Sequence, residues 1–243
     1  MLEKRSFYIN GSWVDPKEQK DIEVINPATE KVCAVISSGS KADVNDAVLA
    51  AKEAFKTWGY STKEERIALL ETFYTLYKKR WNDITDAIIQ EMGAPKDFAS
   101  KLQTGTGASH TKSFIRYLKE FEFEKPLGDH AKNQRLLYEP KGVCALITPW
   151  NWPMNQVCLK VIPALASGCT MILKPSELAP LSAMVLAELI DEAKFPKGVF
   201  NLVNGDGGGN WRRINKSSRR KHDFLYRLNK SRCAYISKCS KRF

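Results

Sequence analysis

The chain has 243 residues, of which 43% are hydrophobic, a size and composition typical of a globular protein with one large or two small domains. No apolar run approaches the roughly 20 residues that cross a bilayer, and residues 1–21 lack the apolar segment of a secretory signal. We therefore expect a cytoplasmic protein with no membrane partner. The six cysteines match no zinc-site spacing, so we expect no metal and a reducing compartment.

The formal net charge of +11 is confined to one end of the chain. Residues 207–243 hold 12 Lys and Arg but a single acid, whereas residues 1–206 hold 26 basic and 26 acidic residues. The aromatic side chains of this tail could stack on bases while its cations neutralise phosphates, which leaves nucleic-acid binding as an alternative function. Because the body is neutral, we expect no nucleic-acid partner.

The first 120 residues predict a hairpin followed by helices. Apolar residues flank an Asn10-Gly11 turn within residues 7–14, which is typical of a β-hairpin. Ser40 and Thr62 each precede a stretch with helical apolar spacing, and the second helix is expected to run without a break to Gly93. A third helix is expected over about 97–118. Residues 121–141 predict two extended segments around a polar turn at Gly128-Asp129, which we interpret as a β-arm.

Residues 142–206 alternate short apolar strands with helices in the order β-α-β-α-β. The strands are expected at 143–148, 170–173 and 199–203, with helices at 155–166 and 179–193. This order predicts an α/β fold with a partial Rossmann-like, doubly wound parallel sheet. Such sheets bind ligands at the carboxyl ends of their strands, so the residues that follow each strand are the candidate site.

Three segments follow the three strands, and each has two interpretations. In Thr148-Pro149-Trp150-Asn151-Trp152-Pro153, the amide of Asn151 could donate to an oxyanion or could simply cap the next helix. In Lys174-Pro175-Ser176-Glu177, the ammonium and carboxylate could hold a ribose diol or could form a solvated turn. In Asn204-Gly205-Asp206-Gly207, Gly205 could let a cofactor approach the backbone, although one Gly-x-Gly is weak evidence.

Taken together, these segments resemble the aldehyde dehydrogenase family over about residues 6–206. The resemblance rests on Ile-Thr-Pro-Trp-Asn, Leu-Lys-Pro-Ser-Glu and Gly-Val-Phe-Asn-Leu-Val-Asn-Gly in this order, and on the earlier Tyr-Ile-Asn-Gly-Ser-Trp, Asn-Pro-Ala-Thr and Glu-Met-Gly-Ala-Pro. It implies NAD(P)-dependent oxidation of an aldehyde to an acid through a cysteine thioester. It also implies roles for particular residues: Asn151 at the oxyanion, Ile147 and Trp150 against the cofactor, Lys174 and Glu177 on the adenosine ribose.

The resemblance further implies that residues 121–141 form an oligomerisation arm, and it favours NAD over NADP because Glu177 would repel a 2′-phosphate. The family's nucleophile lies in a Gly-Gln-x-Cys context and its general base in Glu-Leu-Gly-Gly, and neither motif occurs in these 243 residues. A thioester mechanism needs both groups. We therefore expect a truncated, inactive pseudoenzyme, with a regulatory protomer that joins full-length relatives as the alternative.

The tail at 207–243 has a possible origin in the reading frame. The codons for residues 222–233, read one base later, can encode Met-Ile-Ser-Phe-Thr-Gly-Ser-Thr-Arg-Ala-Gly-Ala, which resembles the family's next cofactor-binding segment. Our hypothesis is that a frameshift near residues 207–210 produced a basic, disordered, out-of-frame tail.

Overall fold

The computed structural model describes residues 1–131 and 133–206, so the expected tail at 207–243 lies outside the described residues. Its main sheet has five strands in the order β3-β2-β10-β9-β8. The bounds are Phe7–Ile9 for β2, Ser12–Val14 for β3, Val143–Ile147 for β8, Thr170–Lys174 for β9 and Phe200–Leu202 for β10. β8, β9 and β10 are parallel, whereas β2 joins β10 antiparallel and forms the predicted hairpin with β3. The parallel α/β prediction is confirmed.

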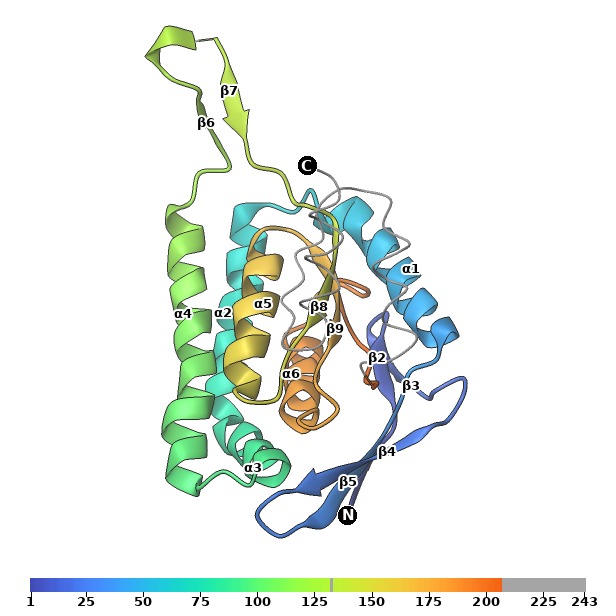
Figure 1. Ribbon diagram of the computed structural model, residues 1–243. Helices are drawn as coiled ribbons and strands as arrows, with labels where there is room; N and C mark the ends of the chain where they lie inside the picture. Colours follow the sequence, from blue (N-terminus) through green and yellow to red (C-terminus); the bar gives the residue numbers. More distant parts are fainter. Residues whose placement is uncertain (132, 207–243) are drawn as a thin grey trace, which may run out of the picture.

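Helices cover both faces of this sheet (Figure 1). The crossover helices α5 (Pro153–Ala166) and α6 (Leu181–Glu192) pack against Met171 and Leu173 of β9 in the larger apolar core. The alternate residue Ile172 points to the other face, where it packs with Val44 and Ala47 of α1 (Lys41–Trp58). This alternation fixes the register of β9, because a shift by one residue would exchange the two faces.

A layer of further helices packs beside α5, and its details differ from the prediction. The expected helix over 63–92 is two helices, α2 (Lys63–Lys79) and α3 (Trp81–Met92), separated at Arg80, whose φ of −98° and ψ of 29° are not helical. The expected third helix begins as a π-helix, η1 (Phe98–Thr104), and continues as α4 (Gly105–Glu120). The apolar spacing continues across the break at Arg80, so periodicity alone could not reveal it.

Two small sheets complete the described part of the chain. β1 (Leu2–Lys4), β5 (Lys31–Ser37) and β4 (Asp21–Asn26) form a three-stranded sheet that the sequence analysis did not predict. β6 (Glu124–Pro126) and β7 (Arg135–Leu137) form an antiparallel pair around the short 3-10 helix η2 (Asp129–Ala131). This pair projects from the body as the predicted arm (Figure 1). No helix among the described residues is long and apolar enough to cross a membrane.

Candidate functional site

The carboxyl ends of β8, β9 and β10 lie at one edge of the main sheet and bring the three predicted segments together. Ile147 is the register partner of Lys174, and the amide of Thr148 donates to the Lys174 carbonyl at 3.1 Å. On the other side of β9, the amide of Val203 donates to the Leu173 carbonyl at 3.0 Å. Parallel pairing therefore aligns the loops after the three strands, as a ligand site at this edge requires.

Lys174 and Glu177 form an ion pair at this edge. The Lys174 ammonium lies 3.1 Å from Glu177 Oε2 and donates to the Pro175 carbonyl at 2.9 Å. The Lys174 side chain is only 3% exposed, whereas that of Glu177 is 37% exposed. Burial lowers the pKa of Lys174, while Glu177 and Asp206 favour its charged form. The pair thus presents an outward acceptor beside an inward donor, a combination that can hold a vicinal diol.

Asp206 belongs to the same electrostatic group, although the sequence analysis did not single it out. Its carboxylate lies 3.1 Å from the ammonium of Lys20, and its charge acts on Lys174. The sequence predicts the loop that contains Asp206 as part of the candidate site, with Gly205 as the residue that lets a cofactor approach. The signal was present in the Gly-Asp-Gly triplet, whereas the contribution of Lys20, 186 positions away, required the fold.

The loop after β8 places Asn151 outside the helix that follows it. The N-cap residue of α5 is Trp152, and no side chain caps this helix, so the capping interpretation of Asn151 is wrong. Trp150 is 53% exposed, while the ring of Trp152 packs edge-on against Phe98 of η1 with centroids 5.6 Å apart. Trp152 and Pro153 therefore anchor a loop from which Asn151 and Trp150 face outward.

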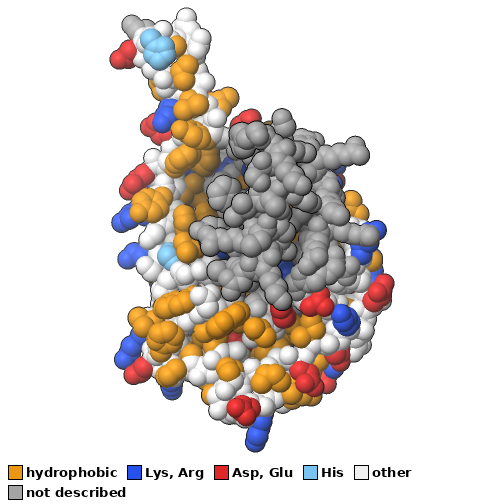
Figure 2. All heavy atoms as spheres, viewed as in Figure 1, with side chains coloured by type: hydrophobic (Ala, Val, Ile, Leu, Met, Phe, Trp, Pro, Cys, Tyr) orange, Lys and Arg blue, Asp and Glu red, His pale blue; other side chains and the backbone are white. Residues whose placement is uncertain are grey.

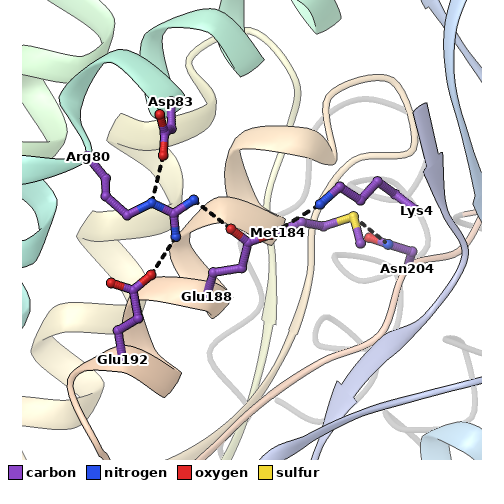
Figure 3. A network of polar contacts seen from close by, with 7 residues as sticks. All are labelled: Lys4, Arg80, Asp83, Met184, Glu188, Glu192 and Asn204. Atoms are coloured by element: carbon purple, nitrogen blue, oxygen red, sulfur yellow. Dashed lines mark hydrogen bonds and ion pairs between the residues drawn. The ribbon is translucent and has the colours of Figure 1, made fainter. Parts of the chain in front are cut away.

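The loop after β10 carries a buried polar atom without a partner among the described residues. Asn204 is fully buried, and its amide nitrogen lies 3.5 Å from the sulfur of Met184 (Figure 3). Its Oδ1 accepts no hydrogen bond from the described residues. Gly205, the next residue, is also buried. A buried acceptor of this kind costs free energy unless something donates to it, so this loop suits a ligand with a donor group.

Two buried cysteines, Cys158 and Cys169, lie apart from this edge. Burial raises the pKa of Cys158 in α5 to about 12. Cys169 precedes the first residue of β9, so it lies at the amino-terminal edge of the sheet, roughly 16 Å along the strand from Lys174. Neither thiol is placed to attack a group held near Asn151.

The parallel sheet, its crossover helices and the polar loops at its carboxyl edge place the chain in the class of Rossmann-like α/β proteins. Residues 13–218 match the model of the aldehyde dehydrogenase family. The chain belongs to this family, and the match extends past residue 206, where the resemblance in the sequence analysis ended.

Individual relatives agree with this assignment. Over 210 residues the chain is 50% identical to a 3-succinoylsemialdehyde-pyridine dehydrogenase from a Pseudomonas species, covering 86% of this chain and 43% of that protein. A crystal structure of an aldehyde dehydrogenase from Bartonella henselae superposes with a TM-score of 0.84 at 56% identity, covering 85% of this chain and 44% of that one.

A third relative was solved with a cofactor. An aldehyde dehydrogenase from Pseudomonas syringae, in a complex with NAD⁺ and octanal, superposes with a TM-score of 0.82 at 44% identity, covering 85% of this chain and 42% of that one. The chain thus spans less than half the length of the relatives it matches.

Proposed function

We propose that this chain supplies the adenosine-binding half of an NAD site of the aldehyde dehydrogenase type. The observation that carries the proposal is the buried Lys174 ammonium paired with the outward Glu177 carboxylate at the carboxyl end of β9. The carboxylate accepts from the ribose hydroxyls and the ammonium donates to them. When bound, NAD⁺ accepts a hydride from the substrate, and this chain's residues orient it.

The other predicted residues surround the same edge and complete the proposal. Ile147, at the end of β8, and the exposed ring of Trp150 provide apolar contact for the cofactor. Buried Gly205 lets the cofactor approach the backbone after β10, next to the unpartnered oxygen of Asn204. Asn151, which caps no helix, presents its amide as the donor to an oxyanion.

We propose NAD rather than NADP as the cofactor. A 2′-phosphate would lie against the Glu177 carboxylate at the position where the 2′-hydroxyl of NAD donates a hydrogen bond. Like charges at such a distance repel, and the only described cation in contact with this carboxylate is Lys174, whose ammonium it already engages.

We propose that these 243 residues alone do not oxidise aldehydes. They contain neither the Gly-Gln-x-Cys nor the Glu-Leu-Gly-Gly motif, and the two buried cysteines, Cys158 and Cys169, offer no substitute. Cys158 is fully buried with its pKa raised to about 12, and Cys169 lies at the opposite edge of the sheet. The chain keeps a binding half-site without a nucleophile or a base to activate water.

Calorimetric titration with NAD⁺ and an NADH-formation assay with octanal, both on the full chain, test this pair of proposals. We expect heat of binding with NAD⁺ and no NADH above a protein-free blank. NADH formation would overturn the inactivity, and a folded chain that binds no NAD⁺ would overturn the half-site.

For residues 207–243, we propose a frameshift near residues 207–210 of a longer aldehyde dehydrogenase gene. The support is the change in composition there and the family-like sequence that the shifted codons can encode. Sequencing the gene beyond the codon for Val203 tests the hypothesis. Codons for Glu-Leu-Gly-Gly and Gly-Gln-x-Cys in the shifted frame would support it, and their absence from that frame would contradict it.

We further propose that the β6–β7 arm joins copies of this chain, or joins it to longer relatives. The arm exposes four large apolar side chains, Phe121, Leu127, Leu137 and Tyr138, each more than 40% exposed. Figure 2 shows hydrophobic side chains on the arm. Phe121 also stacks edge-on against Phe123 and Tyr138, which makes the base of the arm rigid. A projecting apolar arm of this kind is typical of an association surface.

Size-exclusion chromatography with light scattering tests the arm. We expect Leu137→Asp to shift an oligomer to the monomer, whereas Leu49→Asp, at a 63% exposed position on α1, leaves the oligomer intact. A wild-type chain that is strictly monomeric would contradict the proposal.

A further inference from the structure

A second cluster of chemistry-bearing groups lies at the amino-terminal edge of the main sheet, away from the candidate cofactor site. Cys144 is on β8, where its register partner is Met171, and Cys169 lies two residues before Met171, directly before the first residue of β9. Side chains two residues apart on a strand share a face, so both thiols point to the face that α5 covers. Cys144 and Cys169 both line the same cavity of about 710 Å³ between β8 and α5.

The backbone around Cys169 is held rigidly. Trp58 Nε1 donates to the Cys169 carbonyl at 3.1 Å, and the amide of Cys169 donates to the Ala164 carbonyl at 2.9 Å. Gly168 adopts a φ of +80°, and a side chain there would meet the guanidinium of Arg66 at 3.0 Å. The position of the Cys169 sulfur is thus set by contacts from α1, α2 and α5.

Several groups around Cys169 favour its thiolate form. Its pKa is lowered, chiefly because the Cys144 thiol donates a hydrogen bond to it, against the opposing effect of burial. Ser167 Oγ, 3.5 Å from the sulfur, and the backbone amides of Gly142 and Lys141 donate as well. The Arg66 guanidinium is close enough for its charge to interact with this thiolate. Thiolates, not thiols, are the nucleophilic form of cysteine.

We propose that Cys169 and Cys144 form a redox modification site for small hydroperoxides, with Cys169 as the attacking thiol and Cys144 as the resolving thiol. The Cys169 thiolate attacks the peroxide, its S–O bond forms as the O–O bond breaks, and the leaving oxygen departs as water or an alcohol after taking up a proton. The Cys144 sulfur then attacks the sulfenic acid, an S–S bond forms, and water leaves. The peroxide is reduced and two thiols become one disulfide.

The cavity supports the first step, and the second step requires Cys144 to move toward Cys169. The cavity gives a small oxidant access to a sulfur whose residue is otherwise only 4% exposed. Disulfide formation then requires the hydrogen-bonded sulfurs to approach to about 2.05 Å. Because Cys144 pairs with Met171, two residues beyond Cys169, the bond also requires the β8 segment around Cys144 to move toward Cys169.

Mass spectrometry of the full chain tests this site, in a Cys233→Ser, Cys239→Ser background that removes the thiols of the tail. After treatment with hydrogen peroxide and alkylation, trypsin should release a disulfide that joins residues 142–160 to the peptide that begins at residue 161. Cys158→Ala is the matched control, since it lies in the same peptide as Cys144 and should leave the disulfide intact. Cys144→Ala should leave a dimedone-reactive sulfenic acid on Cys169, and Cys169→Ala should abolish both products.

The rate of iodoacetamide alkylation at each cysteine provides a second measurement. Cys169 should react at a lower pH than an ordinary thiol, and Cys158 should stay unreacted in the folded chain. Alkylation of Cys169 that rises only above about pH 8, the range of an ordinary thiol, would overturn the proposal. A peroxide-induced disulfide that persists in Cys144→Ala would overturn the role of Cys144. Neither result depends on NAD binding at the opposite edge.

Discussion

Glu91 on α3 caps the amino terminus of α6 through Ser182, whose Oγ donates to Glu91 Oε1 at 2.6 Å. The backbone amides of Leu181 and Ser182 donate to the same carboxylate. Glu91 is only 3% exposed, and burial raises its pKa to about 7 in spite of these hydrogen bonds. A helix of the main fold therefore begins on a buried carboxyl group from a separate layer.

This relationship predicts a pH-dependent stability. Because the folded pKa of Glu91 lies above its unfolded value of 4.5, the folded state binds the proton more tightly, and this contribution to stability is complete below about pH 4.5. It is lost as pH rises through about 7, by about 3 kcal/mol in all. Urea denaturation should show that the wild type loses stability relative to Glu91→Gln over this range. A difference between the two proteins that is constant with pH would contradict the assignment.

Gly107 on α4 should tolerate no side chain. A Cβ at this position would clash with Tyr77 Oη and lie 3.3 Å from the sulfur of Cys158. Tyr77 is fully buried, and its hydroxyl donates to the Thr104 carbonyl. Gly107→Ala should cost about 1–3 kcal/mol of unfolding free energy through overpacking. Gly105→Ala, two residues earlier and with no contact under 3.8 Å, is the control and should stabilise by about 0.4–1 kcal/mol. Equal effects in chemical denaturation would argue against this packing.

Arg80 fixes the junction of α2 and α3 against α6 (Figure 3). Its guanidinium contacts Asp83, Glu188 and Glu192, each at 2.7 Å, and Lys4 reaches Glu188 from β1 at 3.2 Å. Arg80→Lys should cost about 1–2 kcal/mol, because a single ammonium cannot replace three directed, charge-assisted hydrogen bonds. Lys56→Met, which removes an exposed pair with Glu53, should change stability by less than about 0.5 kcal/mol. A loss for Arg80→Lys no larger than that of Lys56→Met would contradict the role of the network.

Cofactor choice should respond to Glu177. Replacing this carboxylate with glutamine removes the charge that repels a 2′-phosphate while keeping an acceptor for the ribose. We therefore expect Glu177→Gln to improve the affinity for NADP⁺ relative to NAD⁺ by about tenfold, the equivalent of about 1.4 kcal/mol. Calorimetric titration of both nucleotides into both proteins measures the ratio. An unchanged ratio would place the 2′ position elsewhere.

The sequence alone was sufficient for the β-α-β-α-β segment but not for what surrounds it. The strands and helices between Val143 and Leu202 follow the expected order, because each is a short apolar run with its own turn signals. The β1-β5-β4 sheet was missed, since Leu2 pairs with Ala34 across 32 positions and β4 is mostly exposed. No local pattern contains such pairing.

The same limit applies to the functional residues. Lys174 and Glu177 are three positions apart, so their pairing could be anticipated from the motif. The environment of Cys169 depends on Arg66 and Cys144, which only the fold brings near, and the sequence gives no sign that this thiol differs from Cys158. Local chemistry is thus predictable from neighbours in sequence, whereas thiol reactivity here depends on distant contacts.

The most direct test of the central claim is the binding of adenosine monophosphate to the full chain, compared with its 2′-deoxy analogue. We expect measurable binding of adenosine monophosphate, at least tenfold weaker binding of the 2′-deoxy form, and loss of this preference in Lys174→Met and in Glu177→Ala, which removes the acceptor. Leu178→Ala, at an exposed neighbouring position, should keep the wild-type preference. Equal binding of both nucleotides by the folded wild type would contradict a ribose site at Lys174 and Glu177.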